Sequence, residues 1–407
     1  MDRTDRDKPG QFETIRDSSG QKRTRMTRPL DGIRILSVEQ YAAGPYGTQL
    51  LADLGAEVIK IECRELGGDV SRGLGPYLLG EGDSDFFQTF SKGKKSIDLD
   101  LKDAADREAF LELVKTADAV ANNLRGDQPG KLGIDYATLK DANPKIVCAH
   151  LSAYGRGNSR AGWPGYDYLM QAEAGFMMVT GEPEGPPVRA GLSIIDFHTG
   201  SHLAVALLAG IVGAQRTGVG CDMDVSLFDT AVHQLSYPAT WYLNRGHETR
   251  RLPRGSHPSI APSQLVKTGD GWGLLMCQTP KFWDIFCELA GAGHLAADER
   301  FASIAGRHSN LEALTPLLDD LLSQRTSAEW TALFAGRVPF APVLDVKAAL
   351  DNPYLEEISM IETVAHEARP EGVRTVASPF RVNGERPGAT RAPKLGEQDN
   401  EILGGKP

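Results

Sequence analysis

Apolar and polar side chains alternate along residues 32–38 and again along residues 56–62, which is the spacing of β-strands. Between these runs, residues 48–54 have the apolar spacing of a helix, after a loop rich in glycine and proline at residues 42–47. A strand, a loop, a helix and a second strand in this order are typical of nucleotide-binding units. The pattern therefore predicts that the chain opens with a β-loop-α-β unit.

Strand and helix patterns continue to alternate beyond this unit. Residues 119–123 and 146–151 have strand character, and the apolar residues 202–214 have the character of a long helix. Such alternation predicts a parallel sheet flanked by helices, so the expected fold class is α/β.

The opening unit lacks the signature of a dinucleotide-binding site. Its loop has only Gly44 and Gly47, whereas that signature needs three glycines at fixed spacing. Glu62 ends the second strand, where an acid that binds ribose would stand. The missing glycine outweighs this acid, so a nicotinamide-dependent dehydrogenase is disfavoured.

Composition divides the chain further. At 407 residues it is too long for one compact core. Residues 1–28 have almost no large apolar side chains and predict a disordered extension, after which a large domain begins and occupies residues 29–240. Residues 241–265 are rich in arginine, glycine, proline and serine, which predicts a linker and active-site loop. Residues 266–341 predict a smaller α+β domain, and residues 342–407 return to short strands and loops.

Charge and cysteine content exclude several classes of function. The formal net charge of −10 opposes nonspecific binding of nucleic acid. The five cysteines form no Cys-x-x-Cys pair, so no metal site and no disulfide framework is predicted. We also find no apolar stretch near the roughly 20 residues of a membrane helix and no secretory signal, so we expect a soluble, cytoplasmic protein without membrane partners.

Asp167 is the strongest candidate for chemistry. It lies in a turn rich in glycine and proline, residues 162–168, just before an apolar run. A carboxylate there can be partly desolvated and aimed as a nucleophile, although a lone aspartate in a loop is more often a helix N-cap. Asp196, before the long apolar helix, is expected to be such a cap. His198 and His202 stand four residues apart, and we expect them to pack structurally.

The sequence around Asp167 resembles the signature of the catalytic aspartate in the class III CoA-transferases, the family of formyl-CoA and carnitine CoA-transferases. The resemblance runs from about Pro29 to Leu403 and includes residues 30–38, 51–62 and 122–133. It implies a Rossmann-like large domain built from the N- and C-terminal segments, so that residues 342–407 rejoin it, and an interlocked homodimer. It also implies that coenzyme A and acyl-CoA are substrates, with no permanently bound cofactor.

The resemblance also assigns roles to individual residues. Asp167 is the catalytic nucleophile, which forms a mixed anhydride with the acyl group and then a thioester with CoA. The residues expected to bind CoA are Ala43, Gly44, Arg72, Lys94, Asn123, Leu124, Arg125 and Lys131. The residues expected near the acyl substrate are Ala42, Tyr154, Tyr166, Gly255 and His257. Backbone N–H groups of residues 254–257 or of Ala43 and Gly44 are expected to hold the oxyanion.

Departures from the family pattern bear on the CoA site and on the substrate. Leu124 stands where the family has an aromatic residue, Lys131 replaces an arginine, and Asp127 places an acid near the expected phosphate site. Ala42 replaces the glutamine of formyl-CoA transferases, and residues 254–264 lack their run of glycines. An acceptor larger than oxalate, such as another dicarboxylic acid, is therefore expected.

Two alternatives to this transferase remain. An α-methylacyl-CoA racemase on the same fold needs two acid/base groups, and the histidine that such racemases carry before the aspartate is absent from residues 131–145. A non-catalytic acyl-CoA-binding protein would not need Asp167. The donor and acceptor acids, and a transfer within one molecule, stay open.

Overall fold

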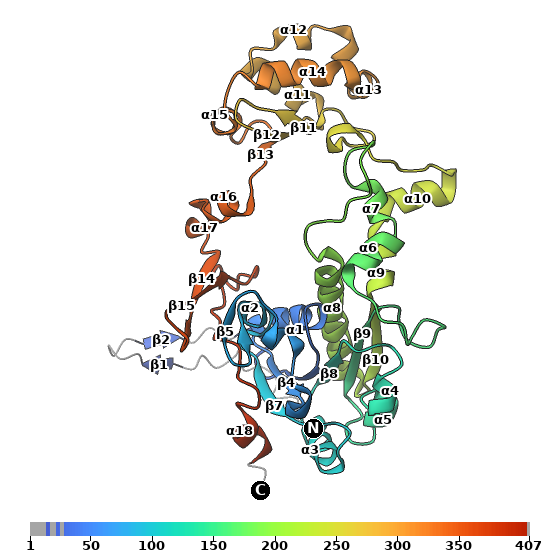
Figure 1. Cartoon of the computed structure of the whole chain (residues 1–407), viewed down its shortest axis with the longest axis vertical. Coiled ribbons are helices and arrows are strands. Elements are labelled where there is room, and N and C mark those ends of the chain that lie inside the picture. The colour runs from blue at the N-terminus through green and yellow to red at the C-terminus, as the bar shows by residue number, and fades with distance from the viewer. Residues whose placement is uncertain (1–13, 17–21, 25–27, 405–407) are drawn as a thin grey trace, which may run out of the picture. The chain divides into compact units, whose positions relative to one another are not determined.

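A computed structural model describes residues 14–16, 22–24 and 28–404 of the chain. The predicted extension, residues 1–28, lies for the most part outside the described residues. Strands β1 (Thr14–Arg16) and β2 (Lys22–Thr24) in this region pair antiparallel. The described residues form two compact units. Their segments can be followed by the colour along the chain in Figure 1.

The larger unit contains the described residues up to Asp167, residues Ile194–Thr230 and the described residues from Glu356. The smaller unit contains Tyr168–Ser193 and Ala231–Leu355. The predicted boundaries at residues 240 and 342 thus differ from those of the structure. The chain leaves the larger unit after Asp167 and returns to it at Ile194, an excursion that was not predicted.

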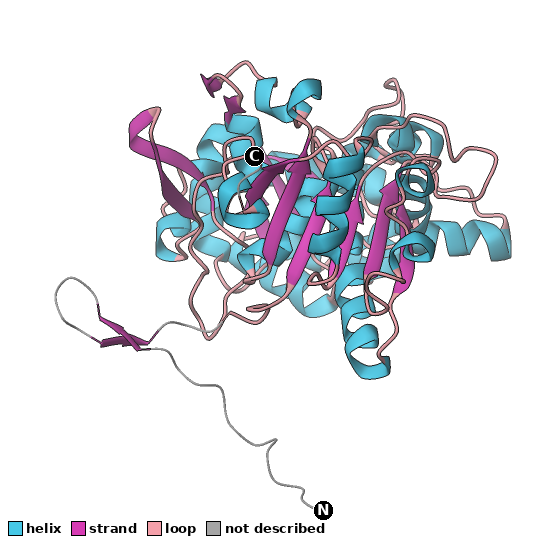
Figure 2. Cartoon of the chain, turned by 90° about the horizontal axis from the view of Figure 1, so that it is seen from below, coloured by secondary structure: helices cyan, strands magenta, loops and turns pink. Residues whose placement is uncertain are grey.

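A six-stranded parallel sheet forms the centre of the larger unit, so the predicted α/β fold class is confirmed. The strand order is β10-β9-β8-β3-β4-β7, and Figure 2 shows these strands side by side. Their bounds are β3 Arg34–Val38, β4 Glu57–Glu62, β7 Lys95–Asp98, β8 Ala119–Asn122, β9 Val147–Ser152 and β10 Cys221–Ser226. The predicted strands therefore exist within one or two residues at each end.

Burial of both faces of this sheet explains its apolar core. Leu36, Ile59, Ile97, Val120 and Cys148 from five different strands are almost inaccessible to solvent. Strands buried on both faces are typical of parallel sheets covered by helices. For the same reason Lys60 and Glu62 of β4 are also buried, which its alternating pattern does not predict, whereas Glu57 is partly exposed.

The helices and the minor strands of the larger unit connect the sheet strands or follow them. The helices are α1 Ala43–Asp53, α2 Asp85–Ser91, α3 Ala104–Val114, α4 Pro129–Leu132, α5 Tyr136–Leu139, α8 Ile194–Thr217 and α18 Asp399–Leu403. Helices α6 (Asp167–Glu173), α9 (Leu227–Gln234) and α17 (Tyr354–Glu357) cross the boundaries between the units. Two antiparallel pairs complete this unit, namely β5 Leu78–Gly80 with β6 Asp83–Ser84 and β14 Ile361–His366 with β15 Arg369–Val376.

Helix α8 is longer than the predicted residues 202–214 and corrects one expectation. Among the described helices it alone is long and apolar enough to cross a membrane by length and composition, so the expectation that no such stretch exists was wrong. Half of its most apolar 18-residue stretch is buried, and the helix packs against α1, β9 and β10. These contacts are those of a core helix.

Two glycines allow α1 and α8 to approach closely. A Cβ on Gly47 would lie 2.3 Å from the backbone oxygen of Gly200, and a Cβ on Gly200 would lie 2.4 Å from the oxygen of Ala43. Neither position therefore tolerates a side chain without movement of the backbone. This contact brings the second turn of α8 next to the start of α1.

The smaller unit has its own aromatic core, which includes Trp283, Phe286, Phe301, Trp330 and Phe334. Its sheet has the order β11-β12-β13, with bounds Ser263–Lys267, Trp272–Met276 and Phe340–Pro342. Its helices are α7 Phe176–Val179, α10 Ser236–Arg245, α11 Pro280–Leu289, α12 Gly293–Ala296, α13 Ile304–Ser309, α14 Leu311–Leu322, α15 Ser327–Phe334 and α16 Val346–Leu350. The helices predicted at residues 281–290 and 311–322 correspond to α11 and α14.

Candidate active site

The sheet has a topological switch point between β3 and β8. The chain leaves β3 through α1 to β4 on one side, and later enters β8 on the other side of β3. Ligands of open parallel sheets bind in the crevice that such a reversal leaves at the carboxyl ends of the strands. The fold therefore indicates a binding site where β3 and β8 end.

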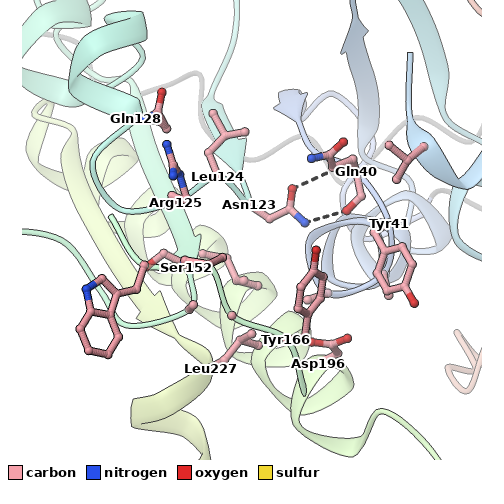
Figure 3. A pocket seen from close by; sticks show the side chains of 18 residues that line it. Gln40, Tyr41, Asn123, Leu124, Arg125, Gln128, Ser152, Tyr166, Asp196 and Leu227 are labelled. Carbon is pink, nitrogen blue, oxygen red and sulfur yellow. Dashed lines mark hydrogen bonds between the residues drawn. The ribbon is translucent and has the colours of Figure 1, made fainter. Parts of the chain in front are cut away.

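A cavity of about 600 Å³ lies at this position. Its walls come from residues 40–43 after β3, residues 123–125 after β8, the end of β9, and residues 163–166 before α6. Figure 3 shows the side chains that line it, with Asp196 and Tyr166 on the same side. All of these residues belong to the larger unit.

The loop that follows β3 is held in an unusual conformation. Tyr41 has a φ of 69°, a left-handed value that costs a residue other than glycine about 1–3 kcal/mol. Its N–H donates to Asp69 Oδ1 over 3.0 Å. The Asn123 amide accepts from the N–H of Gln40 over 3.0 Å and donates to its carbonyl oxygen over 2.7 Å, as Figure 3 shows. These hydrogen bonds fix the wall of the cavity.

Asp167 is the first residue of α6 and is 3% exposed. Its Oδ2 accepts hydrogen bonds from the N–H groups of Ile195, over 2.6 Å, and Asp196, over 3.0 Å. These groups belong to the first turn of the 24-residue helix α8, where the helix dipole favours a negative charge. Asp167 therefore does for α8 what an N-cap does, and its neighbours Gly165 and Tyr166 line the cavity.

Asp196 lies beside Asp167 and lines the cavity. It is the third residue of α8 rather than its cap, so the expected capping role was wrong. Its side chain is buried, with 6% of the residue exposed. Burial, and then the nearby charge of Asp167, raise the pKa of Asp196 to about 7.

A second group of buried charges lies behind the loop. Lys60 Nζ is 2.7 Å from Asp69 Oδ2 and donates to the Glu39 carbonyl oxygen over 2.6 Å. Arg72 pairs with Glu62 through two hydrogen bonds of 2.8 and 2.5 Å. Burial alone would raise the pKa values of Asp69 and Glu62, but these cations and hydrogen bonds lower both below their ordinary values.

Lys94 belongs to this buried group. Its Nζ donates to Glu39 Oε1 over 2.8 Å, to the Pro45 oxygen over 2.9 Å and to Thr48 Oγ1 over 2.7 Å. Its side chain is fully buried, and burial lowers its pKa to about 8. Lys94 and Arg72 are thus absent from the residues that line the cavity, and their predicted contact with CoA stays a prediction.

The other predicted residues divide into four sets. Those that line the cavity are Ala42, Ala43, Asn123, Leu124, Arg125 and Tyr166. Gly44 packs against Asn123, because a Cβ on it would lie 2.8 Å from Asn123 Cβ, whereas Tyr154 stacks edge-on against Trp163, which does line the cavity. Lys131 is exposed and pairs with Asp127 over 2.6 Å.

Gly255 and His257 belong to the smaller unit, where Gly255 lines a separate cavity of about 320 Å³. The backbone N–H groups of residues 254–257 are all engaged within this unit. They donate to the Glu182 side chain and to the carbonyl oxygens of Leu252, Pro253 and Ser263. The expectation that this loop holds the oxyanion therefore finds no open donor in these contacts.

Several residues of the site were not found by sequence reasoning. Gln40, Tyr41, Gln128, Ser152 and Asp196 all line the cavity. Gln40 and Gln128 stand beside motifs that did point to this region, so their proximity was a usable signal. Asp196 gave no such signal, because its contact with Asp167 joins residues 29 positions apart.

No group of three or more histidine, cysteine or acidic side chains that could hold a metal ion occurs in the part of the chain that the structure describes. His202 instead contacts Thr230 through Nδ1 over 3.1 Å. The acids at the cavity are Asp196, which lines it, and Asp167, which lies beside Asp196.

Comparison with known proteins identifies the family of the chain. The family model for CoA-transferase family III matches residues 30–399. The chain is 35% identical over 378 residues to an acetyl-CoA:oxalate CoA-transferase from Acetobacter aceti, which covers 91% of this chain and 94% of that protein. It is 33% identical over 385 residues to a succinate–glutarate CoA-transferase from Agrobacterium fabrum, with 92% and 95% covered.

A solved structure has the same fold. The crystal structure of a CaiB/BaiF family protein from Brucella suis aligns with a TM-score of 0.80 at 32% sequence identity, and the alignment covers 93% of this chain and 99% of that one. The family match extends over most of the chain and includes the cavity and Asp167. The chain therefore belongs to CoA-transferase family III and is a CoA-transferase that uses CoA thioesters as substrates.

Proposed function

We propose that this enzyme moves CoA from an acyl-CoA donor, such as succinyl-CoA, to a carboxylic or dicarboxylic acid, with Asp167 as the acyl carrier. The observation that supports it is the position of Asp167, a buried carboxylate next to the cavity at the ends of β3 and β8. Two backbone N–H groups orient it without neutralising its charge. A nucleophile needs both orientation and charge.

The proposed reaction divides one difficult exchange into acyl transfers. An oxygen of Asp167 attacks the thioester carbonyl, the C–S bond breaks, and CoA leaves as a thiolate. The thiolate attacks the aspartyl carbonyl of the mixed anhydride, which releases the donor acid and leaves CoA as a thioester on Asp167. The acceptor carboxylate then displaces CoA again, and the thiolate takes the new acyl group and frees Asp167.

Each of these attacks places a negative charge on a carbonyl oxygen, which needs hydrogen-bond donors. The start of α1 offers the N–H groups of Ala43 and Gly44, and no side chain caps this helix. Ala43 itself lines the cavity. We therefore assign the oxyanion to the start of α1 in preference to residues 254–257.

The acceptor acid is the finer part of the proposal. Ala42, which lines the cavity, has a smaller side chain than the glutamine of formyl-CoA transferases, and this supports an acceptor larger than oxalate. The relatives named above act on oxalate in one case and on succinate and glutarate in the other. We further propose a cytoplasmic homodimer, whose mass light scattering would test.

A screen of donors against acceptors tests this proposal. Acetyl-CoA and succinyl-CoA are each incubated with oxalate, glutarate and monocarboxylic acids, and new thioesters are identified by mass spectrometry. A new acyl-CoA should form only with the acceptor present and with Asp167 intact. A 2-methylacyl-CoA in deuterated water provides the contrast, because Asp167-dependent uptake of deuterium at the α-carbon without acceptor would indicate a racemase instead.

A further inference from the structure

Asp196 stands out because its carboxyl is buried at the cavity without a partner. Its backbone N–H holds Asp167, but no hydrogen bond or ion pair of its side chain occurs among the described residues. A buried ionised carboxylate without a cation is costly. The ionised form of Asp196 therefore lacks both the solvation that it would have in water and a cation that would replace it.

The surroundings of Asp196 favour its neutral form. Asp167 on α6 lies next to it, and the other ionisable side chains that line the cavity are Tyr41, Tyr166 and Arg125. Arg125 donates to the Gly162 oxygen over 3.3 Å and lies 3.6 Å from Asp127, so other groups engage its charge. Burial and the Asp167 charge raise the pKa of Asp196 to about 7.

The position of Asp196 in the first turn of α8 would by itself favour its ionised form. An acid in the first turn of a helix is common, since the helix dipole favours its ionised form. Here Asp167 accepts the hydrogen bonds from Ile195 and Asp196 in that turn. The N–H groups at the positive end of the helix dipole thus stabilise the charge of Asp167. The charge of Asp167 in turn disfavours the ionised form of Asp196.

We infer that Asp196 works as a protonated carboxyl, which donates a hydrogen bond to an oxygen of the acyl group in the cavity beside Asp167. This inference rests on the proposed function and adds a substrate-binding residue to it. A neutral carboxyl offers one O–H donor, whereas a carboxylate only accepts hydrogen bonds. An ionised Asp196 would also repel the carboxylate of the acceptor acid.

The inference sets the direction of the pH dependence. The donor is present below the pKa of Asp196, near 7, and is lost as the pH rises through it. Above this pH, kcat/KM of the enzyme should fall toward the value of a variant without the donor. Asn at this position keeps an N–H donor that does not titrate.

The test compares pH profiles of kcat/KM for the full-length enzyme and for Asp196→Asn and Asp196→Ala. The native enzyme should lose about tenfold between about pH 6 and pH 8.5, the worth of one hydrogen bond. Asp196→Asn should show a flat profile, and Asp196→Ala should be low throughout. An unchanged pH profile in Asp196→Asn, or equal activity of Asp196→Ala and the native enzyme at about pH 6, would overturn the inference.

Two controls separate this result from the proposed function. Asp229→Asn changes an exposed acid in the first turn of α9 and should leave the profile unchanged. Asp167→Ala should be inactive at every pH, and activity in that variant would reject the proposed function itself.

Infrared titration of the carboxyl band in the free protein gives a reading without turnover. A carboxyl that titrates near pH 7 should vanish in Asp196→Asn and should shift to lower pH in Asp167→Asn, where the neighbouring charge is gone. Absence of any such band dependent on Asp196 would contradict the inference.

Discussion

Two groups of buried carboxylates in the larger unit differ in what surrounds them. Behind the loop after β3, each acid has a cation, as in the pairs of Asp69 with Lys60 and of Glu62 with Arg72. At the start of α8, Asp167 is held by backbone N–H groups, and a second acid, Asp196, lies next to it. Both groups come within a few residues of the same cavity wall. They differ because the first pairs its acids with cations, whereas Asp196 has another acid as its neighbour.

The comparison separates structural charge from chemical charge. The paired acids have lowered pKa values and stay ionised, which fixes the loop that carries Tyr41 and Ala42. Asp196 has a raised pKa, because its surroundings oppose ionisation. A fold keeps such an unfavourable acid at a cavity mainly where its chemistry is used.

The largest expected effect distinguishes the two groups by activity. Asp167→Ala should lower turnover by about 10⁴-fold or more, because the acyl carrier is removed, whereas its stability should fall by only about 1–2 kcal/mol from the lost cap. Steady-state kinetics and urea unfolding measure both. Asp167→Asn is the matched control that keeps a hydrogen-bond acceptor for α8; it should be inactive but native in stability, once mass spectrometry excludes deamidation. Substantial turnover in either variant would place the chemistry elsewhere.

The paired group should respond in stability instead. Lys60→Met leaves Asp69 buried without its cation, so the free energy of unfolding should fall by about 3–5 kcal/mol. Lys102→Met, at an exposed lysine, serves as the control and should change it by less than about 0.5 kcal/mol. Equal small effects in both variants would mean that the buried pair contributes little to the fold.

Replacement of Asp196 should have the opposite effect and increase the free energy of unfolding. Its folded-state pKa is near 7 and its unfolded value near 3.8, so the folded protein binds more protons between these values and loses stability as the pH rises through them. Asp196→Asn should therefore increase the free energy of unfolding at about pH 8 by about 1–4 kcal/mol, and by much less at about pH 4. Urea unfolding at the two pH values measures this. A variant less stable than the native protein at pH 8 would contradict the raised pKa.

The smallest effect concerns the cations. Arg125 lines the cavity and is half exposed, so Arg125→Ala should weaken CoA binding by about 1–2 kcal/mol in calorimetry. Lys131→Ala removes an exposed ion pair and should weaken CoA binding by less than about 1 kcal/mol. A loss of CoA affinity in Lys94→Met as large as in Arg125→Ala, with stability retained, would instead bring the buried Lys94 to the phosphates.

The sequence predicted the fold better than the site. Strand periodicity identified β3, β4, β8 and β9, because burial of apolar side chains follows a local pattern. Helix α1 begins five residues before the predicted start. The segment around Pro45 had been interpreted as a loop, but proline is accepted in the first turn of a helix. The excursion of residues 168–193 from the larger unit was not predicted.

The residues of the site were predictable where a motif surrounds them and not where the fold joins distant segments. Asp167 and residues 123–125 stand in recognisable motifs, and the latter do line the cavity. Lys94 looked like a phosphate ligand because a run of lysines says nothing about burial, and the structure gives it Glu39 as a partner. Asp196 looked like a cap because the apolar pattern places the start of the long helix after it, whereas α8 begins at Ile194.

The most direct test of the account is to trap the acyl carrier. The enzyme is incubated with an acyl-CoA, quenched rapidly, digested and examined by mass spectrometry, with Asp167→Ala treated in parallel. The account predicts a CoA thioester or an acyl adduct on the peptide that contains Asp167, formed at the rate of turnover and absent from the variant. Turnover without any adduct on that peptide, or the same adduct on another residue in Asp167→Ala, would contradict it.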